Sequence, residues 1–349
     1  MKVMHVLNSR IYSGAEKVVC QIIRDFAQTD IQMVYCSPES DIVRSMLQEQ
    51  NVTYLSIPEL TPKNLKQVIE AQKPDLIHAH DMRASFVSAL CCGKIPLISH
   101  IHNNAYNARG ISPKSIAYLL AGWKAKHIFW VSNSSFDGYA FHKLFAKKSS
   151  VLYNIIDTEA IYRKCAQDEH TYDFDLIYVG RLTYQKDPQR LMRLCARLKE
   201  SKPDLKAAIV GTGELETECR QLCRELGIQD NVQFLGFQSN PMKMVSCSKA
   251  LVLTSRWEGT PMCALEAMAL GTPVVSTPSD GMKDLLTDGV SGFLSQDDQV
   301  LAQDLLEMMQ RPERRAAVAA AAKEHFDKIN DANAYHQCIE ACYRQGVTT

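Results

Sequence analysis

Short apolar runs alternate with helical segments along the chain. In the first half, six runs have strand length and are rich in β-branched or aromatic residues, at positions 2–7, 31–36, 76–80, 97–102, 128–132 and 150–153. The segments between them are long enough for helices, for example 15–27 after the first run. This alternation predicts a parallel sheet wrapped by helices, that is, a Rossmann-like domain.

A further strand, loop and helix are predicted at 251–271, L-V-L-T-S-R-W-E-G-T-P-M-C-A-L-E-A-M-A-L-G. Thr260 is the expected N-cap, Pro261 the first helical residue and Gly271 the stop. The backbone N–H groups at the start of such a helix lack intrahelical partners and can hold a phosphate. The residues expected to offer these N–H groups are Gly259, Thr260, Met262 and Cys263.

Two carboxylates flank this predicted anion site. Glu258 lies in the loop and Glu266 lies eight positions later in the helix. A carboxylate beside a phosphate is unfavourable unless it accepts hydrogen bonds from neutral hydroxyls, which a sugar or a ribose presents. The pair indicates a nucleotide-sugar, although two solvated surface glutamates would give the same spacing.

Several motifs resemble a known family. E-G-T-P-x-x-x-L-E at 258–266 and V-G-R-L-T-Y-Q-K-D at 179–187 are similar to the signatures of the retaining GT-B glycosyltransferases of family 4, also called group 1, of the bacterial surface-polysaccharide or lipopolysaccharide type. N-S-R-I-Y-S-G-A-E-K at 8–17 resembles the glycine-rich loop of that family. The resemblance covers nearly the whole chain and is densest from 179 to 294.

The resemblance implies roles on the donor side. Arg181 and Lys186 would bind the donor's diphosphate, Glu258 the hydroxyls of the transferred sugar and Glu266 the ribose. The expected catalytic residues are Arg181, Lys186, Glu258 and His102. The remaining donor-binding residues would be Gly14, Gly259, Thr260, Pro261 and Met262.

On the acceptor side, the resemblance implies Ser13, Glu16, His102 and Asn103. Ser13 stands where the family has the first glycine of its loop. His102 falls where the family places a histidine at the floor of the inter-domain cleft, and Asn103 replaces a residue that is often Asp. Whether His102 or Glu16 acts as a base depends on geometry, which the sequence does not contain.

A chain of 349 residues is long enough for two domains. We expect an acceptor-binding Rossmann-like domain at 1–165, a donor-binding one at 166–331, and a helix at 332–349 that returns to the first domain. In the GT-B fold the two domains face each other across a cleft. Residues 1–165 carry 19 basic and 13 acidic side chains, and 166–349 carry 20 and 26; a basic first half suits a phosphate-bearing or membrane-surface partner, or attraction between the domains.

No cofactor and no metal are expected. The pairs His78/His80 and His100/His102 share strand faces, but no carboxylate or cysteine completes a metal site at useful spacing, and the family implies metal-independent catalysis. The twelve cysteines show neither C-x-x-C nor zinc spacing and are expected to be reduced.

The expected location is the cytoplasm, with peripheral contact to the inner face of the cytoplasmic membrane. No run of 18 apolar residues is present. Residues 112–126 predict a helix with an apolar face through Ile116, Leu119, Leu120 and Trp123 and lysines around it. Interfacial helices have this pattern, and helices packed on a sheet have it more often.

These patterns predict a retaining hexosyltransferase that uses a UDP- or GDP-sugar and a glycan or lipid-linked glycan acceptor, with no nucleic-acid partner. Two alternatives remain: a UDP-GlcNAc 2-epimerase-like enzyme of the same fold, and a non-catalytic subunit that binds a nucleotide-sugar. The epimerase would share the fold without the combined motifs at 179–187 and 258–266.

Overall fold

The computed structural model describes residues 1–102 and 106–348, which form two compact units. The first unit comprises Met1–Ile155 and Asp331–Thr349, and the second comprises Ile156–Asn330. The boundary lies ten residues before the predicted 165/166. Helix α7 (Thr158–Gln167) belongs to the second unit, where the Tyr162 hydroxyl donates to the Ala269 carbonyl (3.1 Å). This contact is not visible in the pattern of residues 158–167.

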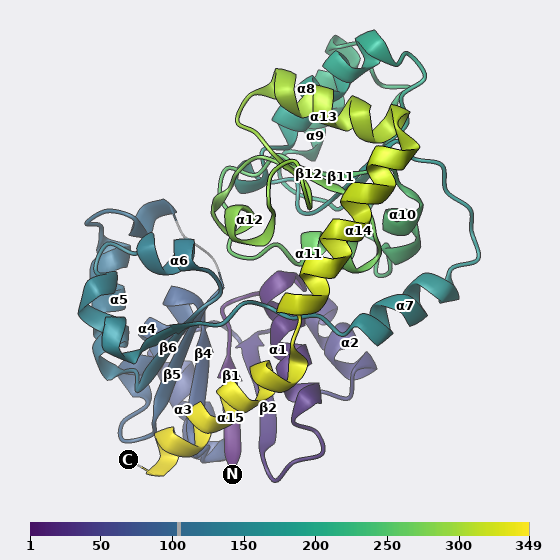
Figure 1. Cartoon of the computed structure of the whole chain (residues 1–349). Helices are drawn as coiled ribbons and strands as arrows, with labels where there is room; N and C mark the ends of the chain where they lie inside the picture. The colour runs from purple at the N-terminus through teal and green to yellow at the C-terminus, as the bar shows by residue number, and fades with distance from the viewer. Residues whose placement is uncertain (103–105, 349) are drawn as a thin grey trace. The chain divides into compact units, whose positions relative to one another are not determined.

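The first unit is built on a seven-stranded parallel sheet of order β3-β2-β1-β4-β5-β6-β7 (Figure 1). All six predicted runs match strands of this sheet to within two residues at each end. Strand β3 has no counterpart among the predicted runs. The bounds are β1 Lys2–Val6, β2 Gln32–Pro38, β3 Tyr54–Ile57, β4 Leu76–His80, β5 Leu97–Ile101, β6 His127–Trp130 and β7 Ser149–Val151.

Helices cover this sheet, and each of the longer ones buries one face. The core beneath them contains Trp130, Tyr118 and Phe145, all almost fully buried. The helix bounds are α1 Gly14–Asp25, α2 Asp41–Glu49, α3 Pro62–Gln72, α4 Asp81–Cys91, η1 Tyr106–Ala108, α5 Pro113–Lys124, α6 Asn133–Asp137 and η2 His142–Lys148.

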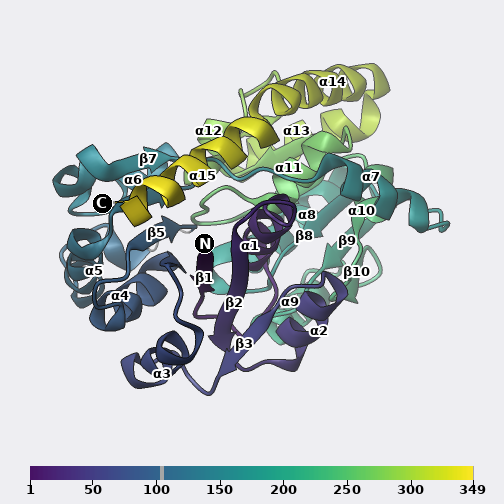
Figure 2. The same ribbon diagram turned by 90° about the horizontal axis from the view of Figure 1, so that it is seen from below.

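The C-terminal helix α15 (Ala332–Thr348) packs on the first unit, as the sequence predicts. The Tyr343 hydroxyl lies 2.7 Å from His78 Nδ1 in β4, and the His336 ring stacks on Phe26 (ring centroids 3.9 Å apart). Arg344 reaches Asp30 (2.8 Å). Figures 1 and 2 show α15 alongside the strands of this unit.

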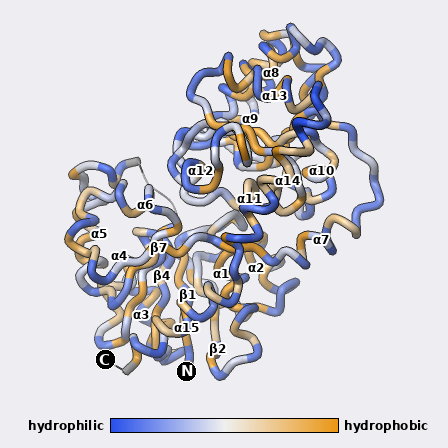
Figure 3. Tube along the Cα trace, viewed as in Figure 1, coloured by the Kyte–Doolittle hydropathy of each residue, from blue (hydrophilic) through white to orange (hydrophobic). Residues whose placement is uncertain are grey.

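The second unit has a six-stranded parallel sheet of order β10-β9-β8-β11-β12-β13. Its strands are β8 Leu176–Val179, β9 Ala207–Val210, β10 Val232–Gly236, β11 Leu251–Leu253, β12 Val274–Ser276 and β13 Phe293–Leu294. The central strands run through hydrophobic segments of the chain (Figure 3). A single apolar core, which includes Tyr178, Leu191 and Met282, fills this unit.

The remaining helices surround that second sheet. Besides α7, they are η3 Tyr184–Lys186, α8 Pro188–Ser201, α9 Glu216–Glu225, α10 Met242–Cys247, α11 Met262–Ala269, α12 Asp280–Leu285, α13 Asp298–Gln310 and α14 Pro312–Ile329. Among the helices of the described residues, none has both the length and the apolar composition needed to cross a membrane.

Candidate functional site

The predicted donor residues of the second unit lie after β8 and β11, which are neighbours in the sheet. Strand β8 connects onward to β9 on one side, whereas β11 leads to β12 on the other. The sheet order therefore reverses between β8 and β11. In open parallel sheets a ligand binds at the carboxyl ends of the strands at such a reversal.

Glycines shape the loop that carries Arg181. The Tyr178 hydroxyl donates to the Arg181 carbonyl (2.7 Å). Gly211, with φ +130°, packs so closely that a Cβ there would lie 1.9 Å from the Gly180 carbonyl oxygen. A Cβ on Gly213 would lie 2.3 Å from the Leu182 carbonyl oxygen. Larger residues at 211 or 213 would therefore displace the backbone of this loop.

Lys186 and Glu258 form an ion pair across the two loops. Lys186 Nζ lies 2.5 Å from Glu258 Oε1, and both side chains are largely buried, at 13% and 6% exposed. The Ser255 hydroxyl donates to the same carboxylate oxygen (2.5 Å). The Thr254 hydroxyl donates to the Lys186 carbonyl (3.2 Å), which ties the loops together. A cation is thus fixed where the anion site was predicted.

Arg181 is not part of this pair. Its side chain is exposed, and within residues 1–102 and 106–348 it forms no ion pair. Glu266, the second glutamate of the motif, is buried in α11. The structure therefore brings Lys186 and Glu258 into contact, leaves the Arg181 guanidinium open to solvent, and holds Glu266 inside the helix that follows the loop.

The start of α11 differs from the prediction. The helix begins at Met262, and its N-cap is Pro261, with ψ 116°, rather than Thr260. Helix α12 shapes the preceding loop: the Gly281 N–H donates to the Glu258 carbonyl (3.4 Å), and a Cβ on Gly281 would lie 1.3 Å from the Gly259 oxygen. This tertiary contact is absent from the local pattern. The Met262 N–H, at the first position of α11, has no carbonyl upstream of it within the helix.

The acceptor-side candidates lie in the first unit. Gly14 is the first residue of α1, and Ser13 precedes it as the N-cap. The Ser13 N–H and hydroxyl both donate to Glu16 Oε2, at 2.9 and 2.8 Å. Through these bonds Glu16, which is buried, completes a capping box at the start of the helix. Asn103 lies outside the described residues.

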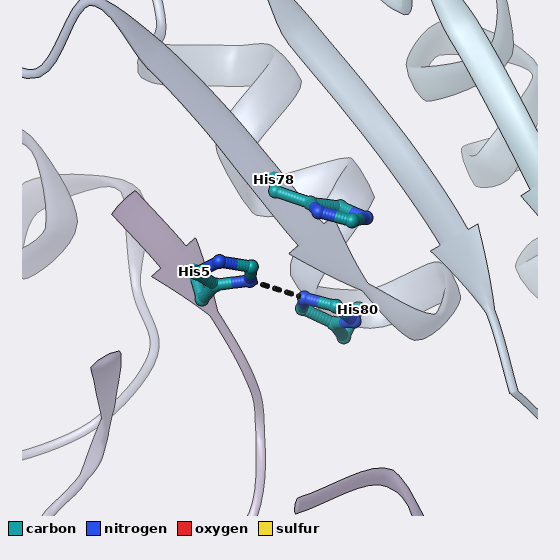
Figure 4. Close-up of side chains that lie close together, drawn as sticks. All are labelled: His5, His78 and His80. Carbon is teal, nitrogen blue, oxygen red and sulfur yellow. Dashed lines mark hydrogen bonds between the residues drawn. The ribbon is translucent and has the colours of Figure 1, made fainter. Parts of the chain in front are cut away.

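Five buried histidines form a cluster on one face of the first sheet: His5 in β1, His78 and His80 in β4, His100 in β5 and His102 just after it. The register pairs His5 with His78 and His80 with His100. Neighbouring rings stack, for example His78 on His80, with centroids 4.3 Å apart (Figure 4). We call this group the histidine cluster.

Hydrogen bonds link three members of the histidine cluster. His5 Nδ1 lies 2.9 Å from His80 Nε2, as drawn in Figure 4, and His80 Nδ1 lies 2.8 Å from His102 Nε2. Two triads, His5/His78/His80 and His80/His100/His102, have ring nitrogens close enough to be considered as metal ligands. Tetrahedral zinc at about 2.0–2.1 Å from each nitrogen requires nitrogens about 3.3 Å apart. The observed separations favour hydrogen bonds.

The chain of bonds determines the tautomers. His5 Nε2 lies 3.4 Å from Met33 Sδ, and a thioether can only accept, so Nε2 carries the proton. His5 Nδ1 then accepts from His80 Nε2–H, and His80 Nδ1 accepts from His102 Nε2–H. His102 therefore keeps an acceptor lone pair on Nδ1, which has no hydrogen-bond partner among the described residues.

Burial holds the histidine cluster neutral. Desolvation lowers the pKa of both His5 and His102 to about 3. It also lowers the pKa values of His78, His80 and His100 well below the ordinary value, with further lowering from neighbouring histidines. At neutral pH every imidazole of the cluster is uncharged, and His102 can accept a hydrogen bond.

Several residues that shape these sites were not singled out from the sequence. Ser255 and Gly281 contact Glu258 or its loop, and His5 hydrogen-bonds to His80, which the sequence indicated only as a possible metal ligand and which orients His102. Ser255 stands at the predicted end of the apolar run 251–255, so strand-end position was an available signal. The contacts of Gly281 and His5 join residues distant in sequence, and no local pattern indicates them.

Comparisons with known proteins identify the family. Residues 166–325 match the family described as "Glycosyl transferases group 1", and residues 12–160 match "Glycosyltransferase Family 4". The chain belongs to the group 1 glycosyltransferases.

Curated relatives include an uncharacterized glycosyltransferase, MJ1059, of Methanocaldococcus jannaschii, 31% identical over 62% of this chain and 58% of that protein. Another is the N-acetylgalactosamine-N,N'-diacetylbacillosaminyl-diphospho-undecaprenol 4-alpha-N-acetylgalactosaminyltransferase of Campylobacter jejuni, 34% identical over 52% of this chain and 51% of that one. The chain thus spans little more than half the length of these two relatives.

Solved structures establish the fold. Anabaena Alr3699/HepE in complex with UDP-glucose has a TM-score of 0.83 at 22% identity, covering 99% of this chain and 100% of that one. The lipopolysaccharide outer core galactosyltransferase WaaB has a TM-score of 0.72 at 20% identity, covering 99% of each chain. With its two parallel-sheet units and these neighbours, the chain has the GT-B fold.

Proposed function

We propose that the protein transfers a sugar from a UDP- or GDP-sugar to a glycan or lipid-linked glycan acceptor in the synthesis of a bacterial surface polysaccharide or lipopolysaccharide. The observation that carries the proposal is the buried Lys186–Glu258 pair at the carboxyl ends of β8 and β11. The second unit would bind the donor and the first the acceptor.

The proposed chemistry follows from the charges. When the glycosidic bond to the diphosphate breaks, negative charge grows on the leaving phosphate. Fixed cations stabilise that charge most in the transition state. Lys186 is held in place by Glu258, and the exposed Arg181 is free to fold over a bound diphosphate. The first N–H groups of α11 add positive potential.

The two glutamates would bind neutral hydroxyls. Glu258 already accepts from the Ser255 hydroxyl, and a carboxylate has further lone pairs for a sugar hydroxyl. Glu266 would hold the ribose. Gly259, Thr260 and Pro261 form the backbone between them, and α12 contacts this loop at Gly281.

His102 would lie beside the sugar and would not serve as a general base. A base must hold the proton that it removes, and a pKa of about 3 is too low to do so near neutral pH. Ser13, Glu16 and Asn103 remain candidates for the acceptor side, with Glu16 engaged by Ser13 in the absence of ligand.

We also propose retention of anomeric configuration and independence from metal. Glu258, the carboxylate proposed to lie beside the transferred sugar, is engaged by Lys186 and Ser255, which favours front-face attack over a covalent sugar adduct. The two cations and the helix start can neutralise a diphosphate without a divalent ion. The Campylobacter relative is named for a diphospho-undecaprenol-linked acceptor, and other relatives are named lipopolysaccharide 1,6-galactosyltransferases. These names support an acceptor at the cytoplasmic membrane face.

The first test is donor turnover in EDTA. Slow release of nucleoside diphosphate from one of a panel of UDP- and GDP-sugars, faster with the right acceptor, is expected at near-equal rates with EDTA or Mg²⁺. Reversible isomerisation of the sugar without an acceptor would instead identify an epimerase. Tight donor binding without turnover under any acceptor would identify a binding subunit, and strict dependence on Mg²⁺ or Mn²⁺ would contradict the metal-free phosphate site.

The second test is stereochemical. From an α-linked donor the product is expected to be α-linked, because the acceptor attacks the face from which the diphosphate leaves. The anomeric proton coupling in the NMR spectrum of the product distinguishes the two anomers. A β-linked product would exclude retention, and a sugar adduct trapped on Glu258 would exclude the front-face route.

A further inference from the structure

Helix α5 of the first unit does not pack as expected from its pattern. Its buried face consists of Ser115, Tyr118, Ala121 and Gly122, and a Cβ on Gly122 would lie 2.4 Å from the Phe145 ring in η2. The opposite face is turned to solvent. It carries three large apolar side chains: Ile116, 52% exposed, Leu120, 41%, and Trp123, 64%.

Two neighbouring segments carry further exposed apolar side chains. Ile111, just before α5, is 81% exposed, and Leu144 in η2 is 62% exposed. Lys148 Nζ bonds to the carbonyls of Trp123 (3.1 Å) and Ala125 (2.7 Å), which holds η2 against the end of α5. We call the five residues Ile111, Ile116, Leu120, Trp123 and Leu144 the α5 surface. Hydrophobic residues recur along this part of the chain (Figure 3).

The surroundings of the α5 surface are strongly basic. Residues 106–155 contain seven Lys or Arg and one acidic residue, Asp137, although the whole chain is neutral. Lys124, Lys126, Lys143 and Lys147 are exposed. This segment therefore accounts for the whole positive excess of the first half of the chain.

We propose that the α5 surface docks the protein on an anionic lipid bilayer, with α5 lying in the plane of the membrane. Apolar side chains in one row, an indole among them and lysines around them, match the interface between headgroups and acyl chains. Anionic headgroups complement the lysines. This docking rests on the proposed function, because a lipid-linked acceptor is confined to the membrane.

A second copy of the chain fits the surface less well. Two α5 surfaces brought together by a two-fold axis would place like charges side by side, which costs free energy. A lipid surface supplies the opposite charge and tolerates separate apolar side chains without a matching cavity.

Vesicle flotation tests the docking. The full chain is expected to float with phosphatidylcholine vesicles containing 30% phosphatidylglycerol and to float far less with phosphatidylcholine alone or at 0.5 M NaCl. The emission of Trp123 should shift to shorter wavelength on binding. Trp123→Ser and Lys147→Glu should each weaken binding at least fivefold.

Matched controls are Ile42→Ser, which removes an exposed apolar side chain (56% exposed) of α2, and Lys63→Glu, which makes the same charge change on α3. Both should bind like the parent protein. Equal weakening by the controls, equal binding to neutral vesicles, absence of binding, or a dimer in sedimentation that Trp123→Ser abolishes would each overturn the docking proposal.

Donor turnover in solution separates the two proposals. Trp123→Ser should release nucleoside diphosphate at the parental rate, because no residue of the α5 surface belongs to the proposed donor site. Normal turnover without vesicle binding refutes the docking alone. Vesicle binding without turnover of any donor refutes the proposed function alone.

Discussion

Lys186→Ala is expected to lower kcat about 10²–10³-fold, because it removes a fixed cation from the leaving diphosphate. It should also destabilise the second unit by about 3 kcal/mol, since it leaves the buried Glu258 carboxylate without its cation. Arg181→Ala should reduce kcat similarly and change the free energy of unfolding by less than about 0.5 kcal/mol, because Arg181 is exposed. Steady-state kinetics and urea unfolding measure both quantities.

A double substitution separates charge pairing from catalysis. Adding Glu258→Gln to Lys186→Ala removes the unpaired charge and should restore most of the lost stability, while kcat stays low. Near-parental kcat at saturating donor in either Lys186→Ala or Arg181→Ala would refute the diphosphate assignment. Full stability of Lys186→Ala would show that the carboxylate is better solvated than its 6% exposure indicates.

Acid is expected to unfold the first unit well before the second. The histidine cluster is buried and neutral, with pKa values below the unfolded value of about 6.5. The unfolded chain therefore binds more protons, so the stability is complete above pH 6.5 and is lost as the pH falls below it. Each histidine that stays neutral in the folded state lowers the free energy of unfolding by about 1.4 kcal/mol at pH 5.5. Five would cost about 7 kcal/mol, similar to the whole stability of a domain.

Urea unfolding between pH 8 and 5 measures this loss. In Trp257→Phe the remaining tryptophans, Trp123 and Trp130, both lie in the first unit and report on it alone. In His100→Leu the number of protons taken up on unfolding should fall by about one. The fold should tolerate this substitution, because both ring nitrogens of His100 lack partners within the described part of the chain. His170→Asn, an exposed histidine of the second unit, should leave it unchanged. Uptake of fewer than one proton on unfolding of the parent protein would contradict the assignment of the cluster as buried and neutral.

The sequence by itself determined the two parallel-sheet units and most strands of the first, because hydrophobic periodicity is a local property. It also indicated Arg181, Lys186, Glu258 and Glu266, since their motifs follow strands directly. Residues 54–57 lack a long apolar run, so the sequence did not indicate strand β3. Pairing with β2 stabilises the extended conformation there.

Only the tertiary structure decided what these residues touch. Lys186 and Glu258 are 72 positions apart, and His5 and His80 are 75 apart, so neither contact leaves a local pattern. Helix α11 starts at Met262, after a loop that contacts α12. Tyr118 and Ala121 form the buried face of α5, so Trp123 is exposed on the other face. An amphipathic pattern gives the faces of a helix, whereas which face is buried depends on the shapes and charges of elements that arrive from elsewhere in the chain.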